Sequence, residues 1–286
     1  MIYKPQELGV TTLEDIDLAE VSKYIHWSFF FLAWKVTGIY DGMEEASTCQ
    51  SCELTWLQGI AAEKRDRAKE ALSLYKDANE LLKELIENKS LRPKVRFSLT
   101  EAKSKDEGIV FYIEDKEIYI PTLRQQKEGQ EVFLSLADFV SPDKDYAGTF
   151  VATIEGAEDL VAKYEKEDDT YRSLLVQTLS DRLAEATTEW VHEQIRKKYW
   201  GYAKDEKLSI EEMLKVDYQG IRPAVGYPSL PDQSVIFILE KVLNFKDLGV
   251  SVTENGAMYP TASTCGLIFA HPQSSYFMVG KIGEDQ

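Results

Sequence analysis

The sequence predicts an α+β fold built around an antiparallel sheet. Its strand-like segments come in groups and do not alternate strictly with helices. The helical segments carry apolar residues three or four positions apart, which is typical of amphipathic helices. The chain has 286 residues, of which 44% are apolar, enough for one large core. We therefore expect one domain over residues 1–286, mainly helical in residues 1–90 and with a sheet and further helices in residues 91–286.

The first half of the chain is expected to hold one long helix followed by strands. Apolar residues recur at helical spacing from Glu53 to Glu87, so a single amphipathic helix is predicted there. From Val95 to Ile120, short β-rich pieces alternate with polar turns and predict a small antiparallel unit. Another strand is predicted at "GTFVATI" (Gly148 to Ile154).

The second half is expected to begin with helices and to end with strands. One short and one long helix are predicted over Ala157 to Tyr199. A helix over Ser209 to Asp217 opens with the capping-box pattern "SIEE", and another is expected over Asp232 to Leu243. Three strand-like runs close the chain: "GVSVTENGAMYP", "STCGLIFAHP" and "SSYFMVGKIG".

Charge and hydropathy exclude two classes of partner. The formal net charge is −16, which repels polyphosphate, so nucleic acid is not expected to bind. The chain has no uncharged apolar run of about 18 residues that could span a membrane. The N-terminus lacks the basic and then apolar design of a signal peptide. We therefore expect a cytoplasmic protein that binds neither nucleic acid nor membrane.

The three cysteines do not suggest a disulfide framework. Cys49 and Cys52 form a lone CxxC, and the remaining Cys265 leaves an odd number. A zinc site would need a second pair of ligands at suitable spacing, which the sequence does not offer. We interpret Cys49 and Cys52 as two small residues at the start of a helix, with redox or metal chemistry as the minor alternative.

Familiar catalytic and nucleotide-binding motifs are missing. The sequence contains neither GxGxxG nor GxxxxGK[ST], so no glycine-rich phosphate loop is expected. His26, His192 and His271 have no nucleophile nearby in the sequence, and GxSxG is absent. We predict no catalytic dyad and no metal site.

The loop "GIRPAVGYPSLPDQ" (Gly220 to Gln233) is unusually stiff for a connector between helices. Its prolines fix the backbone and bias the residues before them towards extended geometry. The amides from Ala224 to Tyr227 then need partners from water, protein or ligand. Gly226 permits close approach to the backbone, and Arg222 offers a planar charged fork suited to a carboxylate. By composition alone we interpret the loop as a rigid connector with Arg222 in a salt bridge, with a ligand site as the alternative.

This loop belongs to an ordered series of motifs. Upstream stand "DIDLAEVSKYIHWSFFFLAW", "YKDANELL", "LRQQ", "LADFVSP", "LSDRLAEA" and "YWGYA", and downstream stand "VTENGAMYPTAS", "FAHP" and "VGKIGEDQ". Together with "RPAVGYP" they resemble the activation domain of cobalamin-dependent methionine synthase, which binds S-adenosylmethionine. The resemblance covers nearly the whole chain. Gln233 departs from it, since the family commonly has a histidine at the end of this loop.

The resemblance implies a fold and a set of ligand contacts. The fold would be a single C-shaped α+β domain with a twisted antiparallel sheet flanked by helices, with the ligand groove in residues 91–286. Arg222 would bind the methionyl carboxylate, the backbone at Ala224 and Gly226 would contact the ligand, and other contacts would come from the side chains of Asp138, Glu185, Tyr227 and Tyr276. One arginine beside carboxylates complements a ligand that carries an ammonium, a sulfonium and a carboxylate.

The resemblance also implies a function. The chain would bind S-adenosylmethionine and support reductive methylation of cob(II)alamin, reactivating a cobalamin-dependent methionine synthase in methionine biosynthesis. Since Met1 lies close upstream of the first motif, we expect a separate polypeptide that acts in trans, as an accessory module and not a complete enzyme. The cobalamin would be carried by the partner, and a flavodoxin-like or other reductase would supply the electron. The alternatives are a non-catalytic S-adenosylmethionine-binding or docking subunit, or an activator of another corrinoid methyltransferase.

Overall fold

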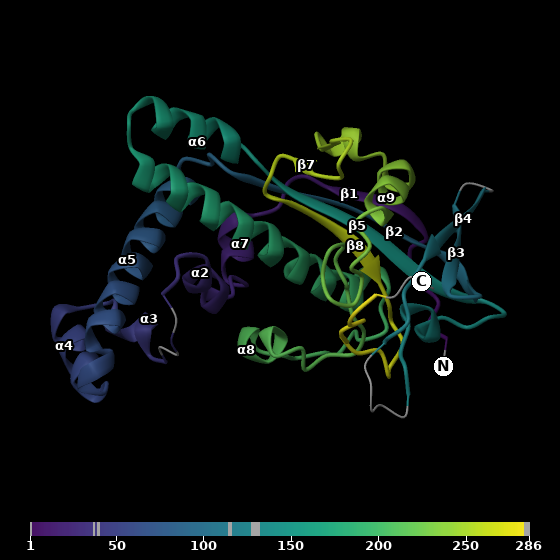
Figure 1. The fold of residues 1–286 in the computed structure, drawn as a ribbon, viewed down its shortest axis with the longest axis horizontal. Coiled ribbons are helices and arrows are strands. Elements are labelled where there is room, and N and C mark those ends of the chain that lie inside the picture. The colour runs from purple at the N-terminus through teal and green to yellow at the C-terminus, as the bar shows by residue number, and fades with distance from the viewer. Residues whose placement is uncertain (1, 37, 39–40, 114–115, 127–131, 283–286) are drawn as a thin grey trace.

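The computed structural model describes residues 2–36, 38, 41–113, 116–126 and 132–282. It combines helices with an antiparallel sheet, so the predicted fold class is confirmed. Figure 1 shows α3, α4 and α5 at one end of the molecule and β3 and β4 at the other, with the long helix α7 running between them. None of the helices in the described part of the chain has the length and apolar character needed to cross a bilayer.

The N-terminal part is mainly helical but starts with a strand. It contains β1 (Gly9–Leu13), α1 (Leu18–Ser22), α2 (Trp27–Ala33), α3 (Met43–Ala46), α4 (Gln50–Gly59), a short 3-10 helix (Ala62–Lys64) and α5 (Arg65–Glu87). The prediction of one continuous helix over Glu53 to Glu87 is wrong. Ile60 and Ala61 are not helical, with ψ angles of 139° and 138°, and they follow Gly59, a residue that weakens helices.

The central sheet is antiparallel throughout and has the order β4-β3-β2-β5-β8. Its strands are β2 (Arg92–Lys105), β3 (Gly108–Ile113), β4 (Lys116–Pro121), β5 (Asp145–Glu155) and β8 (Ser263–Ile268). One edge of β2 pairs with β5 along most of its length, while the other edge pairs first with β1 and then with β3. The strands predicted over Val95 to Ile120 and at "GTFVATI" are therefore confirmed.

The remaining helices are α6 (Ala157–Lys166), α7 (Thr170–Gln194), α8 (Ile210–Leu214) and α9 (Val235–Leu243), with 3-10 turns at Leu136–Phe139 and Phe245–Leu248. The short and long helices predicted after Ala157 are α6 and α7, and α7 continues into a π-helical turn (Ile195–Tyr199). The predicted capping box is present at α8: the Ser209 and Glu212 side chains each accept a hydrogen bond from the other residue's backbone N–H.

Alternation along β5 assigns the two faces of the sheet to different helices. Phe150 lies in a cluster with Val191 of α7 and Ile195 of the π-helical turn that continues it. The next residue, Val151, lies in a cluster with Leu239 of α9. Successive side chains of a strand point to opposite faces, so α7 and α9 cover opposite sides of the sheet.

The C-terminal segment is only partly strand. β6 (Ser251–Val252), β7 (Met258–Tyr259) and β8 account for the first two strand-like runs. The third prediction, over "SSYFMVGKIG", is wrong, because residues 274–282 form no strand. Separate hydrogen bonds hold this segment instead: the amide of Phe277 donates to Ser229 Oγ, and that of Val279 to the carbonyl of Pro228.

Candidate functional site

The proline-rich loop lies along the free edge of β8. The amide of Val225 donates to the carbonyl of Cys265 at 2.9 Å, and the amide of Leu267 donates to that of Pro223 at 3.0 Å. This close approach requires Gly266, because a Cβ there would meet the Pro223 carbonyl oxygen at 2.2 Å. The loop is thus an irregular extension of the sheet, and its position fixes the side chains before and after it.

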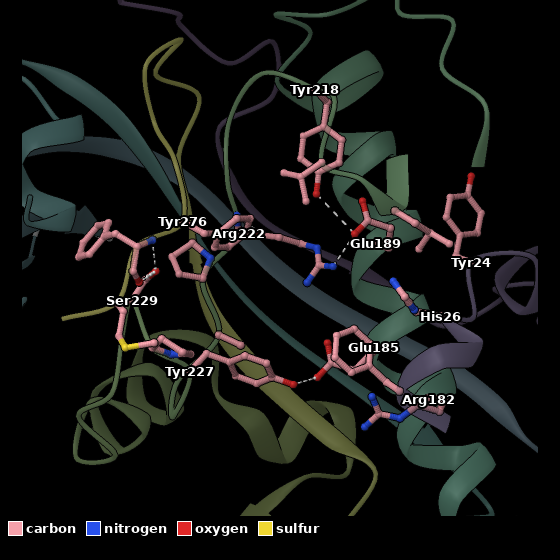
Figure 2. A pocket seen from close by; sticks show the side chains of 18 residues that line it. Tyr24, His26, Arg182, Glu185, Glu189, Tyr218, Arg222, Tyr227, Ser229 and Tyr276 are labelled. Carbon is pink, nitrogen blue, oxygen red and sulfur yellow. Dashed lines mark hydrogen bonds and ion pairs between the residues drawn. The ribbon is translucent and has the colours of Figure 1, made fainter. Parts of the chain in front are cut away.

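This loop forms one wall of a groove of about 610 Å³. Figure 2 shows side chains from α7 facing those of the loop across this groove, with residues of the N-terminal part and of the C-terminal segment beside them. The lining residues are Tyr24, His26, Phe29, Arg182, Glu185, Glu189, Leu214, Val216, Tyr218, Arg222, Pro223, Ala224, Tyr227, Pro228, Ser229, Tyr276, Phe277 and Met278. The wall is therefore assembled from segments that are far apart in the sequence.

The centre of the groove is an ion pair between Arg222 and Glu189. Arg222 Nη2 lies 2.5 Å from Glu189 Oε2, and the two side chains are only 15% and 7% exposed. Burial opposes the positive charge of Arg222, but the facing Glu189 outweighs it and raises the pKa of the guanidinium above its ordinary value. Among the described residues, Arg222 Nε and Glu189 Oε1 have no hydrogen-bond partner. The pair therefore leaves one buried donor and one buried acceptor without a hydrogen-bond partner in the described part of the chain.

Two tyrosines of the groove are hydrogen-bonded to its charged residues or their backbone. The hydroxyl of Tyr276 accepts a hydrogen bond of 3.0 Å from the backbone N–H of Arg222. The hydroxyl of Tyr227 donates one of 2.5 Å to Glu185 Oε1. Both rings are partly exposed, Tyr227 by 47% and Tyr276 by 42%. They offer aromatic faces at positions fixed by polar contacts.

A second charged layer lies behind the groove. Arg196, fully buried, forms a double hydrogen bond with Glu206, and its guanidinium lies 3.9 Å from the ring centre of Tyr218. His192 is also buried, 5.1 Å from the same ring. Its burial, together with Arg196 and Arg222, lowers the pKa of the imidazole well below its usual value, so His192 is neutral.

The structure brings together five of the seven residues that the sequence assigns to S-adenosylmethionine. Glu185, Arg222, Ala224, Tyr227 and Tyr276 all line the groove. Their contacts with a ligand stay predictions, but the structure places them in one groove although they span more than 90 positions.

Gly226, the sixth of these residues, lies behind the groove wall and not among the lining residues. Its amide donates to the carbonyl of Leu230, and the amide of Tyr227 donates to that of Ala224. Its φ angle of +87° favours glycine, and a Cβ there would also meet Gln233 Nε2 at 2.4 Å. Gly226 shapes the turn that presents Tyr227, and its amide already has a protein partner.

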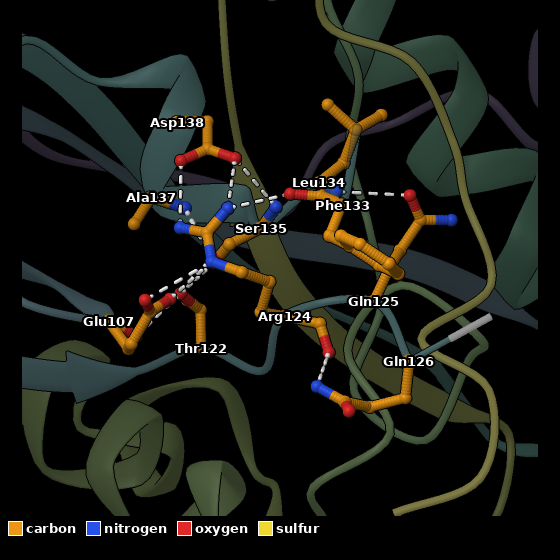
Figure 3. A network of polar contacts seen from close by, with 10 residues as sticks. All are labelled: Glu107, Thr122, Arg124, Gln125, Gln126, Phe133, Leu134, Ser135, Ala137 and Asp138. Carbon is orange, nitrogen blue, oxygen red and sulfur yellow. Dashed lines mark hydrogen bonds and ion pairs between the residues drawn. The ribbon is translucent and has the colours of Figure 1, made fainter. Parts of the chain in front are cut away.

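Asp138, the seventh, lies elsewhere (Figure 3). Its two carboxylate oxygens accept hydrogen bonds of 2.8 and 2.9 Å from Arg124, and Oδ2 also caps the 3-10 turn by accepting from the backbone N–H of Ser135. Burial raises the pKa of Asp138, but these hydrogen bonds outweigh it and hold the pKa below its ordinary value. Asp138 is not among the residues that line the groove.

Sequence reasoning missed Glu189 and the contribution of the N-terminal part. Glu189 follows Glu185 by four positions in α7, and residues four apart share a helix face, so the spacing could have revealed it. Tyr24, His26 and Phe29 line the groove although the ligand site was expected in residues 91–286. Burial lowers the pKa of His26. No local pattern in the sequence shows that these residues face α7.

The cysteine prediction is partly wrong. Cys49 is the N-cap of α4, as expected of a residue that opens a helix. However, Cys49 and Cys52 form a disulfide, with their Cα atoms 5.1 Å apart. A spacing of three at the first turn of a helix brings two cysteines within bonding range, so one local pair needs no wider framework. Cys265 is free and buried.

The groove combines opposite charges with aromatic surface. Arg182 and Arg222 are its cationic side chains, Glu185 and Glu189 its anionic ones, and several aromatic rings surround them. Such a site suits a ligand that carries both a carboxylate and a cationic group on a body with a flat ring. Its one serine, Ser229, donates its hydroxyl to the carbonyl of Phe277, and the charged residues face one another, a geometry that favours binding and positioning.

Comparison with known proteins agrees with this description. The chain is similar to a solved structure described as the crystal structure of the MetH reactivation domain bound to AdoHcy, with a TM-score of 0.87 and 35% sequence identity, over 100% of this chain and 86% of that one. The C-shaped α+β fold implied by the motifs is therefore confirmed. Residues 17–286 match the family model described as vitamin B12 dependent methionine synthase, activation domain. This chain therefore belongs to the family of activation domains of vitamin B12-dependent methionine synthase.

Proposed function

We propose that the groove binds S-adenosylmethionine and that the bound ligand is presented to the cobalamin of a methionine synthase, in trans. The observation that carries this proposal is the Arg222–Glu189 pair, which keeps Arg222 Nε and Glu189 Oε1 without partners in the described part of the chain. Buried polar atoms are normally satisfied, so an open donor beside an open acceptor in a groove indicates a bound zwitterion. The solved relative is bound to AdoHcy, which has the same amino-acid end.

Each part of the groove has a role in this proposal. Arg222 binds the ligand carboxylate, while Glu189 and Glu185 complement its ammonium and sulfonium charges. Tyr227 and Tyr276 provide aromatic contact for the adenosyl part. These side chains come from α7, the loop and the C-terminal segment. A ligand bound between them is contacted from several sides, which fixes its orientation.

The chemistry explains why the groove needs no acid or base. When bound, S-adenosylmethionine supplies a methyl group on a positive sulfur, and transfer to reduced cobalt releases a neutral thioether with no proton to move. The work of this chain is then to hold the ligand, leave its methyl group accessible and exclude water. The partner carries the cobalamin, and a flavodoxin-like or other reductase delivers the electron.

Two measurements test this function in sequence. Calorimetry with S-adenosylmethionine should show binding at one site, and S-adenosylhomocysteine should compete for it. The chain should then be mixed with a methionine synthase that lacks its own activation domain and holds oxidised cobalamin, together with reductant and S-adenosylmethionine. We expect methylated cobalamin to appear in the absorption spectrum only when the chain and S-adenosylmethionine are both present.

The outcomes separate the alternatives. Binding without methylation would favour a non-catalytic S-adenosylmethionine-binding or docking subunit. Methylation of a different corrinoid protein, but not of methionine synthase, would favour service to another methyltransferase. If the chain did not bind S-adenosylmethionine at millimolar concentration, the proposed function would be wrong.

A further inference from the structure

The Cys49–Cys52 disulfide lies far from the groove and has no part in the proposed function. It sits at the start of α4, where Cys49 is exposed and Cys52 is half-buried. Figure 1 shows α4 at the end of the molecule opposite β3 and β4. A disulfide on the surface can exchange with thiols in solution, whereas one inside a core cannot.

The surroundings of the two sulfur atoms differ. Cys49 Sγ accepts a hydrogen bond of 3.0 Å from the backbone N–H of Cys52 and lies 3.1 Å from the hydroxyl of Ser51. Near Cys52 Sγ the hydroxyl is that of Thr48, at 3.6 Å, and Thr48 also donates to the carbonyl of Glu45 at 2.7 Å. A hydroxyl has one proton, so Thr48 cannot serve both acceptors fully. Cys49 therefore has the better donors for a thiolate.

Helix geometry reinforces this difference. Cys49 is the N-cap of a ten-residue helix, so its sulfur faces the positive end of the helix dipole. The charged side chains on the neighbouring elements are Glu44 and Glu45 of α3, Glu53 of α4, and Lys76 of α5, which pairs with Glu53 at 2.6 Å. The carboxylates of α3 oppose a thiolate at either cysteine, while the amide of Cys52 and the hydroxyl of Ser51 favour a thiolate at Cys49.

We propose that Cys49 and Cys52 form an accessible dithiol–disulfide centre in which Cys49 is the nucleophilic thiol. In the reducing direction, one thiolate of an external dithiol attacks Cys49 Sγ. The Cys49–Cys52 bond breaks, and Cys52 leaves with the electron pair and takes up a proton. The second thiol of the reagent then loses its proton and attacks the reagent's first sulfur in the mixed disulfide. This releases Cys49 as a thiolate, which takes up a proton. Two electrons pass, the external dithiol becomes a disulfide, and both cysteines become reduced.

Alkylation of the folded chain tests the centre, with dithiothreitol as the dithiol probe and mass spectrometry as the readout. We expect Cys49 and Cys52 to be protected in the oxidised chain, labelled together after dithiothreitol, and protected again after treatment with oxidised glutathione. Cys265 is an internal control: it is 1% exposed and burial raises its pKa to about 12, so it should stay unlabelled until the chain is unfolded. A disulfide that resists dithiothreitol in the folded chain, or cysteines labelled without it, would overturn the proposal.

Single-cysteine variants test which thiol is the nucleophile. In Cys52→Ser the remaining Cys49 should react with iodoacetamide at pH 7 about tenfold faster than Cys52 does in Cys49→Ser, since a thiol pKa lower by about one unit gives about tenfold more thiolate. In the Cys52→Ser background, Ser51→Ala should lower the alkylation rate of Cys49 by about twofold, because one donor to its thiolate is lost. Ser47→Ala is the matched control, because Ser47 donates to the carbonyl of Glu44 and not to sulfur. Equal reactivity of Cys49 and Cys52 would contradict the assignment.

Discussion

Two arginine–carboxylate centres in this molecule differ in how completely the protein satisfies them. At Arg124, all three guanidinium nitrogens bond to oxygens of Glu107, Phe133 and Asp138. At Arg222, Nη2 bonds to Glu189, while Nε has no partner among the described residues. The incomplete centre is also the more deeply buried of the two. One centre holds a turn in place with all its nitrogens bonded, and the other lines a groove with one guanidinium nitrogen and one carboxylate oxygen lacking partners among the described residues.

This difference separates a structural ion pair from a binding site. Burial of a charged pair has a desolvation cost that is offset only when the remaining donors and acceptors are also satisfied. The Arg124 centre meets that condition within the protein. The Arg222 centre meets it only if another molecule supplies the missing partners, which is why we assign the ligand to this side of the molecule.

The largest expected effect is the loss of Arg222. Arg222→Met keeps the length of the side chain and removes its charge, leaving Glu189 buried without its partner. We expect the free energy of unfolding to fall by about 3 to 5 kcal/mol and the affinity for S-adenosylmethionine to fall by about 100-fold or more. Denaturant unfolding and calorimetry measure the two effects separately.

A second substitution separates stability from binding at this centre. Adding Glu189→Gln to Arg222→Met removes the unpaired carboxylate, so most of the lost stability should return. Affinity should not return, because the ligand carboxylate still lacks its cation. If the folded double variant bound S-adenosylmethionine as tightly as the original chain, Arg222 would not be the carboxylate partner.

Asp138 gives the opposite expectation. Asp138→Ala removes charged hydrogen bonds to Arg124 and the cap on Ser135, at a cost of about 1 to 2 kcal/mol of stability for this half-exposed pair. S-adenosylmethionine affinity should change by less than about twofold, because Asp138 does not line the groove. Thermal unfolding with calorimetry on the same sample measures both. A tenfold loss of affinity with unchanged stability would show that Asp138 contributes to ligand binding and would contradict this expectation.

The sequence predicted much of the fold because local patterns determine it. The capping box at Ser209 and the strand at "GTFVATI" appear as expected. The break between α4 and α5 was missed, since apolar residues continue through Ile60 and Ala61 although the backbone there is not helical. The strand predicted over "SSYFMVGKIG" is wrong for residues 274–282, whose backbone is held by single groups of distant loops and not by a strand of the described chain, and Gly283 lies outside the described residues.

The site was less predictable than the fold for a related reason. Motifs nominated Arg222, Tyr227 and Tyr276, which line the groove, and also Asp138, which does not and which pairs with Arg124. Only tertiary contacts show that Glu189 and not Asp138 faces Arg222. A carboxylate in a motif indicates that it has a polar or charged partner. Tertiary packing decides whether that partner is a ligand or another residue.

A smaller effect links this centre to pH through His192, which lies against the ring of Tyr218 and feels the positive charges of Arg196 and Arg222. Because folding lowers the pKa of His192 below that of the unfolded chain, the unfolded state binds more protons as the pH falls below about 6.5, and stability decreases.

We expect this histidine to contribute a loss of about 1 kcal/mol between pH 7 and pH 5.5. His192→Leu should remove that part of the pH dependence, whatever its effect on stability at pH 7. His271→Gln is the matched control: this imidazole is less buried and its pKa is also lowered, so its removal should change the slope less. Urea unfolding across this pH range measures the slope. An unchanged slope in His192→Leu would mean that the imidazole takes up its proton in the folded chain as readily as in the unfolded one, and that the positive charges behind the groove do not reach it.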